Sequence, residues 1–349
     1  MPQLDLSSTP SAKPLSQNGT RTWLRRALTV ALLGLLIYFF WPLFSEIKAA
    51  AGLFRTADWI WLGVAVLIQV ISYWFLTWLN KLSLQPFSGN IKTGPLAAVL
   101  TSMAFISVAV PSAGLSGMAM RVRLLRKYGY RPEEALFSMV VETVLELIAL
   151  VSVGILGVAY LVESGRLEEG NVIFLVAVGI ASIGTMWYGW ILVRDPVKSR
   201  RIAFKLAKVW NRLGGRFRTF DQDYLDERLT FFQTNLSHYH SSVLWKLPLA
   251  AYGKVFLDVL CLGASFRMFN YNISPSTLFI GYGLVLTFSG MGALPGGLGM
   301  TDAMVPIIFS WLRVPGSVAI AAGLTYRLIA FWLVRFAGYI SWLVLERKK

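Results

Sequence analysis

Two pairs of ionisable residues stand at helical spacing inside apolar stretches of the chain, where charges are rare. Glu142 and Glu146 are one helical turn apart in one stretch, and Lys254 and Asp258 are one turn apart in another. A charge at the middle of a bilayer costs about 2.5–3.5 kcal/mol even on the most favourable scale, so such residues must pair or line a wet cavity. The two glutamates are suited to binding a cationic head group or carrying a proton. The alternative is a structural pair satisfied by a nearby arginine or by the backbone. Lys254 and Asp258 are suited to an internal ion pair or, facing a cavity, to contact with a phosphate.

Two further charged residues lie in the C-terminal part of the chain. Asp302 comes directly after a glycine-rich break in an apolar stretch, and Arg327 lies well inside the last apolar run. Glycine gives the backbone the freedom that such a break requires. Asp302 is suited either to capping the half-helix that follows or to presenting a carboxylate at the centre of a bundle, with Arg327 as its partner.

Arg121 opens a group of basic residues that follows an earlier break, at Pro111, Gly114 and Gly117. A guanidinium there is suited to binding a phosphate at the cytoplasmic opening of a path through the membrane, because it can bind two oxygens at once. The alternative is that Arg121, like most arginines of its segment, anchors the cytoplasmic end of the chain. The expected substrate-binding residues are Arg121, Glu142, Glu146, Lys254, Asp258, Pro295, Gly296, Gly297, Gly299, Asp302 and Arg327.

Several kinds of chemistry are excluded by what the sequence lacks. Cys261 is the one cysteine, so an intrachain disulfide and a cysteine metal site are excluded. His238 and His240 form an H-x-H pair, which we interpret as interfacial polar residues rather than metal ligands. The phosphate-binding loop of ATPases and the nucleophile elbow of hydrolases are absent from the sequence. We therefore expect no metal, no cofactor and no built-in ATPase, and any transport must draw on a gradient.

The composition excludes an ordinary soluble protein. Of the 349 residues 56% are hydrophobic and only 15% are charged, and the mean hydropathy is +0.59. A soluble domain carries about 25% charged residues. The formal net charge is +15, which in a soluble chain would suggest nucleic acid. In a membrane chain the positive charge instead indicates which loops lie in the cytoplasm, and it indicates contact with anionic lipid.

The apolar runs predict helices that cross a membrane and two helices that are too short to do so. A straight span needs roughly 17 residues or more, and the runs 95–110 and 302–312 do not reach that length. The predicted runs are 27–44, 59–79, 95–110, 134–162, 171–193, 244–268, 277–293, 302–312 and 317–344.

The basic residues favour one orientation, because cytoplasmic loops carry the excess of Lys and Arg. The segment that precedes the first run, the segments 121–131 and 194–228, and the C-terminus are all basic. We assign them to the cytoplasm. The basic residues left on the opposite side are Lys48, Arg55, Arg166, Arg267 and Arg313.

This orientation requires two stretches to enter the membrane and turn back. The stretch 95–117 enters from the cytoplasmic side and turns at Pro111, and the stretch 277–312 enters from the other side and turns at Pro295. Broken helical hairpins of opposite orientation are typical of inverted-repeat transporters. The alternative is two kinked spans whose glycines permit close packing. The sequence thus predicts an all-α, polytopic membrane helix bundle with about six full spans plus two re-entrant half-helix hairpins in inverted-repeat arrangement.

Two polar segments lie outside the apolar runs. Residues 1–20 are rich in Ser, Pro and Gln and predict a disordered cytoplasmic tail, followed by a single transmembrane domain over 21–349. The segment 194–243 is too long for a plain loop. Its apolar residues, such as Ile202 and Leu206, recur at helical spacing between Lys and Arg. This pattern predicts an amphipathic cytoplasmic segment on an anionic leaflet.

The same residues resemble a known family. The stretch Pro295–Ala303, followed by Leu324–Leu328 and Phe331–Trp332, is similar to the C-terminal signature of the lysylphosphatidylglycerol synthase transmembrane region, the flippase-like UPF0104 family. The earlier stretches Pro111–Leu125 and Val140–Glu146 agree with that pattern. The resemblance covers most of the chain.

The resemblance implies an integral membrane module that moves lipids between leaflets. In bifunctional members a soluble aminoacyl-transfer domain follows this module. This chain ends at Lys349, just after the last run, so we expect no such domain and no synthase activity. Met118 and Thr143 stand where the family pattern has a glutamate and an arginine, which favours a shifted substrate preference.

We therefore expect a flippase or transporter in the plasma (bacterial inner) membrane, with both termini cytoplasmic, that moves a phospholipid or a related amphiphile. The expected partners are membrane lipids, anionic on the cytoplasmic side, and no nucleic acid; a homo-oligomer or a lipid-synthesis partner is compatible with the sequence. One alternative is a membrane enzyme on lipid-linked substrates, with Glu142 and Glu146 as acid and base. Another is a regulatory or scaffold subunit whose segment 194–228 docks a synthase.

Overall fold

The computed structural model describes a large part of the chain. The described residues are 50–110, 114–163, 239–290 and 300–347, together with isolated residues between 195 and 235. Every regular element within these ranges is a helix, and no strand occurs among them. Outside the described residues lie the predicted tail 1–20, the runs 27–44 and 171–193, most of the segment 194–243, Pro111 and the break from Pro295 to Gly299.

Most of the described helices follow the apolar runs closely. They are α2 (Ile60–Ser83), α3 (Thr93–Ala109), α4 (Leu115–Arg126), α5 (Pro132–Glu163), α9 (Ser241–Leu244), α10 (Lys246–Arg267), α11 (Pro275–Gly290), α12 (Met300–Trp311), α13 (Gly316–Arg327), the π-helical η2 (Leu328–Leu333) and α14 (Val334–Arg347). Several helices begin one or two residues before their runs, and α4 and most of the single turn α9 lie in the more polar segments between the runs.

Four of the described helical stretches are long and apolar enough to cross a membrane, judged by length and composition. They are Ile60–Ser83, Pro132–Val153, Ser242–Arg267 and Gly316–Arg347. Each coincides with a run predicted from the sequence, so the prediction of an all-helical membrane protein is confirmed for the described part of the chain. The predicted total of six full spans includes two runs that lie outside it.

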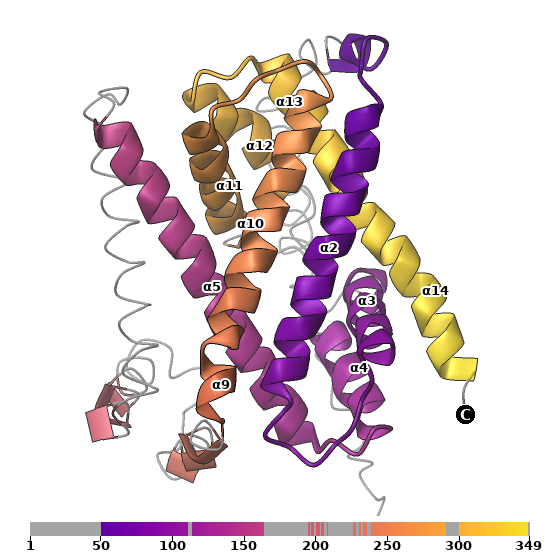
Figure 1. Ribbon diagram of the computed structural model, residues 1–349, viewed down its shortest axis with the longest axis vertical. Helices are drawn as coiled ribbons and strands as arrows, with labels where there is room; N and C mark the ends of the chain where they lie inside the picture. The colour runs from indigo at the N-terminus through magenta and orange to yellow at the C-terminus, as the bar shows by residue number, and fades with distance from the viewer. Residues whose placement is uncertain are drawn as a thin grey trace, which may run out of the picture. The chain divides into compact units, whose positions relative to one another are not determined.

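Helices α2 and α10 run side by side in opposite directions (Figure 1). At one end, the backbone N–H of Asp58 donates to the carbonyl of Met268 at 2.8 Å. At the other end, the buried hydroxyl of Tyr239 donates to the carbonyl of Ser83 at 2.7 Å. These contacts hold the two helices together at both ends.

Helices α3 and α4 form a tight hairpin of short helices (Figure 1). Their 17 and 12 residues correspond to about 26 and 18 Å, less than the roughly 30 Å of a bilayer core. Gly114, just before α4, has a φ of +86°, a left-handed conformation that glycine adopts without strain. The hydroxyl of Ser116 donates to the carbonyl of Ile106 at 3.1 Å. A β-carbon on Gly117 would lie 1.9 Å from the hydroxyl of Ser107, so this glycine permits the close approach.

Helices α11 and α12 also pack against each other. This pair lies near the end of the described helices that is opposite to the pair α3–α4 (Figure 1). The hairpin of α3 and α4 closes at its outer end through the backbone N–H of Asn90, which donates to the carbonyl of Tyr128 at 3.1 Å. In the other pair, a β-carbon on Gly281 would lie 2.3 Å from the ring of Phe309. That ring lies 5.0 Å from Phe266, near the far end of α10. The described helices thus form two short pairs that point in opposite directions (Figure 1).

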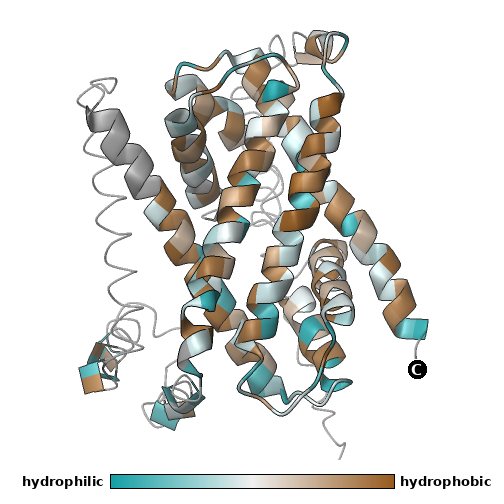
Figure 2. Cartoon of the chain, viewed as in Figure 1, coloured by the Kyte–Doolittle hydropathy of each residue, from teal (hydrophilic) through white to brown (hydrophobic). Residues whose placement is uncertain are grey.

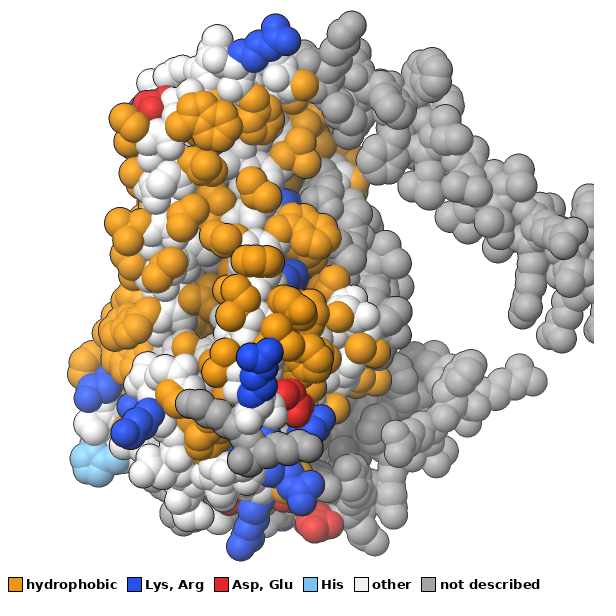
Figure 3. Space-filling model, turned by 90° about the vertical axis from the view of Figure 1, so that its right-hand side faces the viewer, with side chains coloured by type: hydrophobic (Ala, Val, Ile, Leu, Met, Phe, Trp, Pro, Cys, Tyr) orange, Lys and Arg blue, Asp and Glu red, His pale blue; other side chains and the backbone are white. Residues whose placement is uncertain are grey.

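Most basic residues of the described helices and their turns lie at one of the two ends of the helices. Hydrophobic residues cover the middle of the helices in Figure 2, and Figure 3 shows Lys and Arg side chains gathered below the hydrophobic band of one face. The basic residues at the end where α2 finishes include Lys81, Lys92, Arg123, Arg126, Lys127, Arg131, Lys246 and Arg347. Those at the opposite end are Arg55, Arg267 and Arg313. Of the basic segments assigned to the cytoplasm, the two that the structure describes, 121–131 and the C-terminal end of α14, therefore lie at the same end.

Candidate functional site

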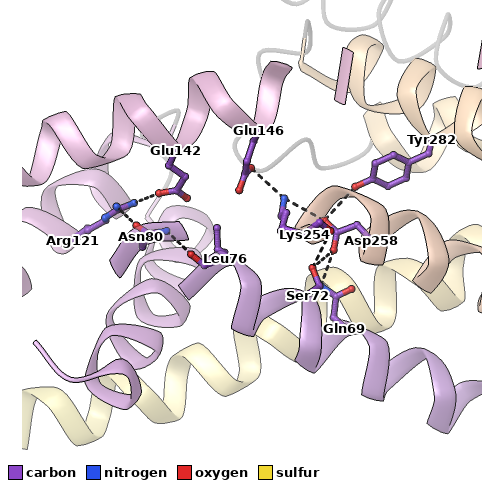
Figure 4. A network of polar contacts seen from close by, with 10 residues as sticks. All are labelled: Gln69, Ser72, Leu76, Asn80, Arg121, Glu142, Glu146, Lys254, Asp258 and Tyr282. Atoms are coloured by element: carbon purple, nitrogen blue, oxygen red, sulfur yellow. Dashed lines mark hydrogen bonds and ion pairs between the residues drawn. The ribbon is translucent and has the colours of Figure 1, made fainter. Parts of the chain in front are cut away.

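Two neighbouring groups of charged and polar side chains lie between α2, α4, α5, α10 and α11 (Figure 4). They include several of the residues that the sequence analysis proposed for substrate binding. These are Arg121 from α4, Glu142 and Glu146 from α5, and Lys254 and Asp258 from α10. We call the two groups together the charged network.

The first half of the charged network is centred on Arg121. Its side chain is only 1% exposed, and its Nη1 lies 2.7 Å from Oε2 of Glu142. Its Nη2 donates to the side-chain carbonyl of Asn80 on α2, and to the hydroxyl of Ser138 at 3.0 Å. Arg121, on α4, is thus held by side chains of two other helices, α2 and α5, and its charge is neutralised by a carboxylate that is itself mostly buried.

The second half is centred on Lys254. Its Nζ lies 3.2 Å from Oε2 of Glu146 and 3.2 Å from Oδ2 of Asp258, so one ammonium group bridges two carboxylates. The pairing of Lys254 with Asp258 within α10 is the internal ion pair that the sequence suggested. The contact with Glu146 joins residues 108 positions apart in the chain, and helical spacing alone does not indicate it.

Asp258 is surrounded by neutral donors as well as by Lys254. The hydroxyl of Ser72 donates to Oδ1 at 2.5 Å, and Nε2 of Gln69 donates to the same oxygen at 3.4 Å. The hydroxyl of Tyr282 on α11 donates to Oδ2 at 3.4 Å (Figure 4). Hydrogen bonds to a charged acceptor are about twice as strong as neutral ones. The carboxylate is therefore held in place by contacts from three helices, α2, α10 and α11.

Helix α5 connects the two halves. It begins at Pro132, which suits the first turn of a helix because its missing N–H is not needed there. The side chain of Glu134 accepts a hydrogen bond from the backbone N–H of Arg131 at 2.9 Å and stabilises this start. Glu142 and Glu146 then follow one turn apart, separated by about 6 Å along the axis. The result is a row of both signs of charge across the interior, in which the two neighbouring glutamates each pair with one cation, Arg121 or Lys254.

The sequence analysis missed the contribution of α2. Gln69, Ser72 and Asn80 are buried and face the charged network, yet they are uncharged and stand in an apolar run. Their positions, with Leu76 between them, are three or four residues apart. This spacing places them on one face of a helix. A search for uncharged polar residues at helical spacing within an apolar run would have found this face.

Several buried polar atoms of the charged network have no hydrogen-bond partner in the part of the chain that the structure describes. They are Nε of Arg121, Oε1 of Glu146 and Oε1 of Gln69. A buried polar atom without a partner costs about 1–3 kcal/mol. These atoms mark positions where a water molecule or a polar group of a substrate would be bound favourably.

Arg327 and Arg335 form a separate arrangement on the last helical stretch. Arg327 is 7% exposed. Its guanidinium carbon lies 4.1 Å from the ring centre of Phe331, and that of Arg335 lies 3.3 Å from the same centre. Nη1 of Arg335 also donates to the carbonyl of Phe331 at 3.0 Å. Cation–π contacts of this kind stabilise guanidinium groups away from water.

The side chains of the remaining predicted site residues lie outside the part of the chain that the structure describes. The side chain of Asp302 is outside the described residues, although its backbone belongs to α12. Pro295, Gly296, Gly297 and Gly299 are outside them as well. The expected pairing of Asp302 with Arg327 therefore remains a prediction. Within the described residues, no group of three or more His, Cys, Asp and Glu side chains is arranged to hold a metal ion.

Comparison with known proteins agrees with the membrane character of the fold. Residues 26–338 match the family model described as the lysylphosphatidylglycerol synthase TM region. A UPF0104 membrane protein of Methanocaldococcus jannaschii is 23% identical over 295 residues, which cover 82% of this chain and 84% of that protein. A UPF0104 membrane protein of Methanothermobacter thermautotrophicus is 24% identical over 303 residues, covering 81% and 85%. Because the family model spans most of the sequence, the chain belongs to the family of lysylphosphatidylglycerol synthase transmembrane regions.

Proposed function

We propose that this protein moves a phospholipid or a related amphiphile between the two leaflets of the membrane. The head group would pass along the charged network while the acyl chains remain in the bilayer. The observation that carries this proposal is the bridge of Lys254 between Glu146 and Asp258, inside helices that are long and apolar enough to span a membrane.

Stability alone does not require the charged network. Well-packed apolar residues in place of a buried ion pair are often neutral or stabilising by 1–4 kcal/mol. Ionisable residues within membrane helices are therefore functional by default. A row of both signs of charge, with some polar atoms unpartnered, is suited to exchanging its internal pairs for contacts with a zwitterionic or charged head group.

The proposal includes an arrangement in the membrane. The pair α3–α4 and the pair α11–α12 would be the two re-entrant hairpins of an inverted repeat, entering from opposite sides. The end that holds Lys81, Arg123 and Lys127 would face the cytoplasm of a plasma membrane, together with both termini. The short lengths and opposite directions of the two pairs support this arrangement.

The test is reconstitution of the full chain in liposomes with fluorescent lipids of anionic, cationic and neutral head group. We expect at least one class to cross faster than in protein-free liposomes. Lys254→Gln should slow the crossing of that class about tenfold or more. A tenfold change corresponds to a rise of about 1.4 kcal/mol in the barrier to crossing. Lys246→Gln, at the start of the same helix, is the matched control and should have no effect. Crossing no faster than in protein-free liposomes for all three classes contradicts the proposal.

The alternative of a membrane enzyme is less well supported by the contacts. Glu142 and Glu146 would act as acid and base, but each carboxylate is bound to a cation, Arg121 or Lys254. Conversion of a lipid extract by the pure protein would favour the enzyme over the transporter. A scaffold role would be favoured by a synthase that still co-purifies after every acidic residue of the charged network is neutralised.

A further inference from the structure

A pocket of about 450 Å³ lies at the basic end of α2, apart from the charged network. Its wall combines aromatic rings from α2 with polar residues from the turn between α2 and α3 and from the start of α3. The residues that matter here are Trp74, Trp78, Lys81, Gln85, Asn90 and Thr93. Among the residues that the structure describes, no acidic one lines the pocket.

The pocket faces away from the head-group path proposed above. Trp74, Trp78 and Lys81 follow one another at intervals of three or four residues, so they share one face of α2. Ser72 and Asn80, which contact the charged network, lie on a different face. The body of the helix therefore separates the pocket from the path.

The polar part of the pocket is positively charged. Nζ of Lys81 donates to the hydroxyl of Thr93 at 3.1 Å, a neutral partner that leaves its charge uncompensated within the pocket. Thr93 is also the first residue of α3, whose start has no side-chain cap and no acidic residue in its first turn. Pro95, the third residue of α3, has no N–H, so Thr93 and Gly94 supply the backbone donors at this start. Such donors and the dipole of a helix start favour an anion. The ammonium group of Lys81 and the start of α3 thus both favour a negatively charged ligand.

An apolar track leads from the pocket along α2. Trp74 and Trp78 stack with ring centres 5.8 Å apart. Above them, Leu67 and Val70 are each 61% exposed and Ile71 is 39% exposed. Tryptophan prefers the membrane interface, where one part of the ring is apolar and the other is wet. This face of α2 is therefore apolar at Leu67 and Ile71 and cationic at Lys81. That order matches the acyl chain and the phosphate of a phospholipid.

We propose that this pocket binds the head group of an anionic phospholipid, whose phosphate contacts Lys81 and the start of α3 and whose acyl chain lies along Leu67, Ile71 and Trp74. The bound lipid anchors the basic end of the protein in its leaflet and is distinct from the lipid that is moved. The proposal does not rest on transport, because it concerns a different face of α2.

The far wall of the pocket includes Tyr130 and Gly89, which pack closely against each other. The ring of Tyr130 lies against Gly89, where a β-carbon would come within 2.6 Å of the ring. Burial raises the pKa of Tyr130, and the charge of Glu134 raises it further. The hydroxyl therefore stays protonated and is able to donate to a phosphate oxygen.

The test is photo-crosslinking in the full chain. Gln85 is replaced by benzoylphenylalanine, and the protein is reconstituted in vesicles of phosphatidylglycerol, phosphatidylethanolamine and phosphatidylcholine in equal amounts. After irradiation, mass spectrometry identifies the lipid bound to the protein. We expect phosphatidylglycerol adducts to exceed phosphatidylcholine adducts about fivefold, which corresponds to the attraction of one lysine near an anionic surface.

Lys81→Gln should remove that enrichment, and Lys81→Arg should retain it. Lys246→Gln is the matched control, because Lys246 lies at the same end of the neighbouring helix beside Trp245 but does not line the pocket. Equal adducts of the three lipids, an enrichment that survives Lys81→Gln, or crosslinks to protein in place of lipid would each overturn the proposal. None of these outcomes depends on whether any lipid is moved.

Discussion

The guanidinium of Arg121 lies 2.7 Å from the carboxylate of Glu142, in a setting where Arg121 is 1% exposed and Glu142 is 13% exposed. Removal of one partner from a buried pair leaves an uncompensated charge, which costs about 3–5 kcal/mol. We therefore expect Arg121→Gln to lower the free energy of unfolding by about that amount, measured by denaturant titration in detergent.

The control for this change stands on the same helix. Arg123 pairs with Glu346 at 3.2 Å, but its side chain is 62% exposed. Exposed pairs contribute about 0.2–1 kcal/mol, so Arg123→Gln should have little effect. The double variant Arg121→Gln with Glu142→Gln should lose less than the sum of the two single variants. Additive losses would show that the two side chains do not interact.

A second prediction concerns the hydroxyl of Ser72, which binds Asp258. Its loss in Ser72→Ala leaves a charge-assisted hydrogen bond unmade, which costs about 1.5–3 kcal/mol. Ser83→Ala, in the same helix, removes only a local hydrogen bond to the carbonyl of Leu79. We expect a smaller loss there, about 0.5–1.5 kcal/mol. Thermal unfolding of the two variants in the same detergent compares them directly, and equal shifts in Tm would count against the role given to Ser72.

A third prediction tests the packing of α14 on α3. A β-carbon on Gly338 would lie 2.1 Å from the backbone carbonyl oxygen of Thr101, an atom that cannot turn aside. Overpacking of this kind costs about 1–3 kcal/mol, so Gly338→Ala should be destabilising by that much. Gly63→Ala is the control, because no atom lies within 4 Å of the added carbon. A Gly338→Ala protein as stable as the parent would mean that α3 and α14 are not in this contact.

A fourth prediction tests the orientation of the two ends. In a Cys261→Ala background, Asn90→Cys places a thiol at the basic end and Asn272→Cys places one at the opposite end. We expect a membrane-impermeant maleimide to label Asn272→Cys in intact cells and Asn90→Cys only in inverted vesicles, because basic segments remain in the cytoplasm. Labelling of Asn90→Cys in intact cells would reverse the assignment.

The helices could be predicted from the sequence because the apolar runs define them. The run 95–110 became α3 at Thr93–Ala109, and the run 244–268 became α10 at Lys246–Arg267. The turn between α3 and α4 was also predictable, since Gly114 supplies the left-handed backbone conformation that the reversal uses.

The partners of the charged residues were harder to predict. The pairing of Lys254 with Asp258 follows from helical spacing, but its contact with Glu146 depends on how α5 crosses α10. Likewise, the position of Arg121 beside Glu142 depends on how α4 packs on α5. Helix packing angles are not encoded in one helix alone, so a single sequence gives the residues of the charged network without their pairing.

The π-helical segment Leu328–Leu333 has a consequence for the two faces of the last helical stretch. A π turn contains one residue more than an α turn, and each residue rotates an α-helix by about 100°. Before this segment, Gly323 faces Val305 on α12; after it, Gly338 faces Thr101 on α3. The extra residue therefore sets the rotational phase between these two contacts. A one-residue deletion within Leu328–Leu333 would shorten the helix by little, yet it would turn α14 away from its partner.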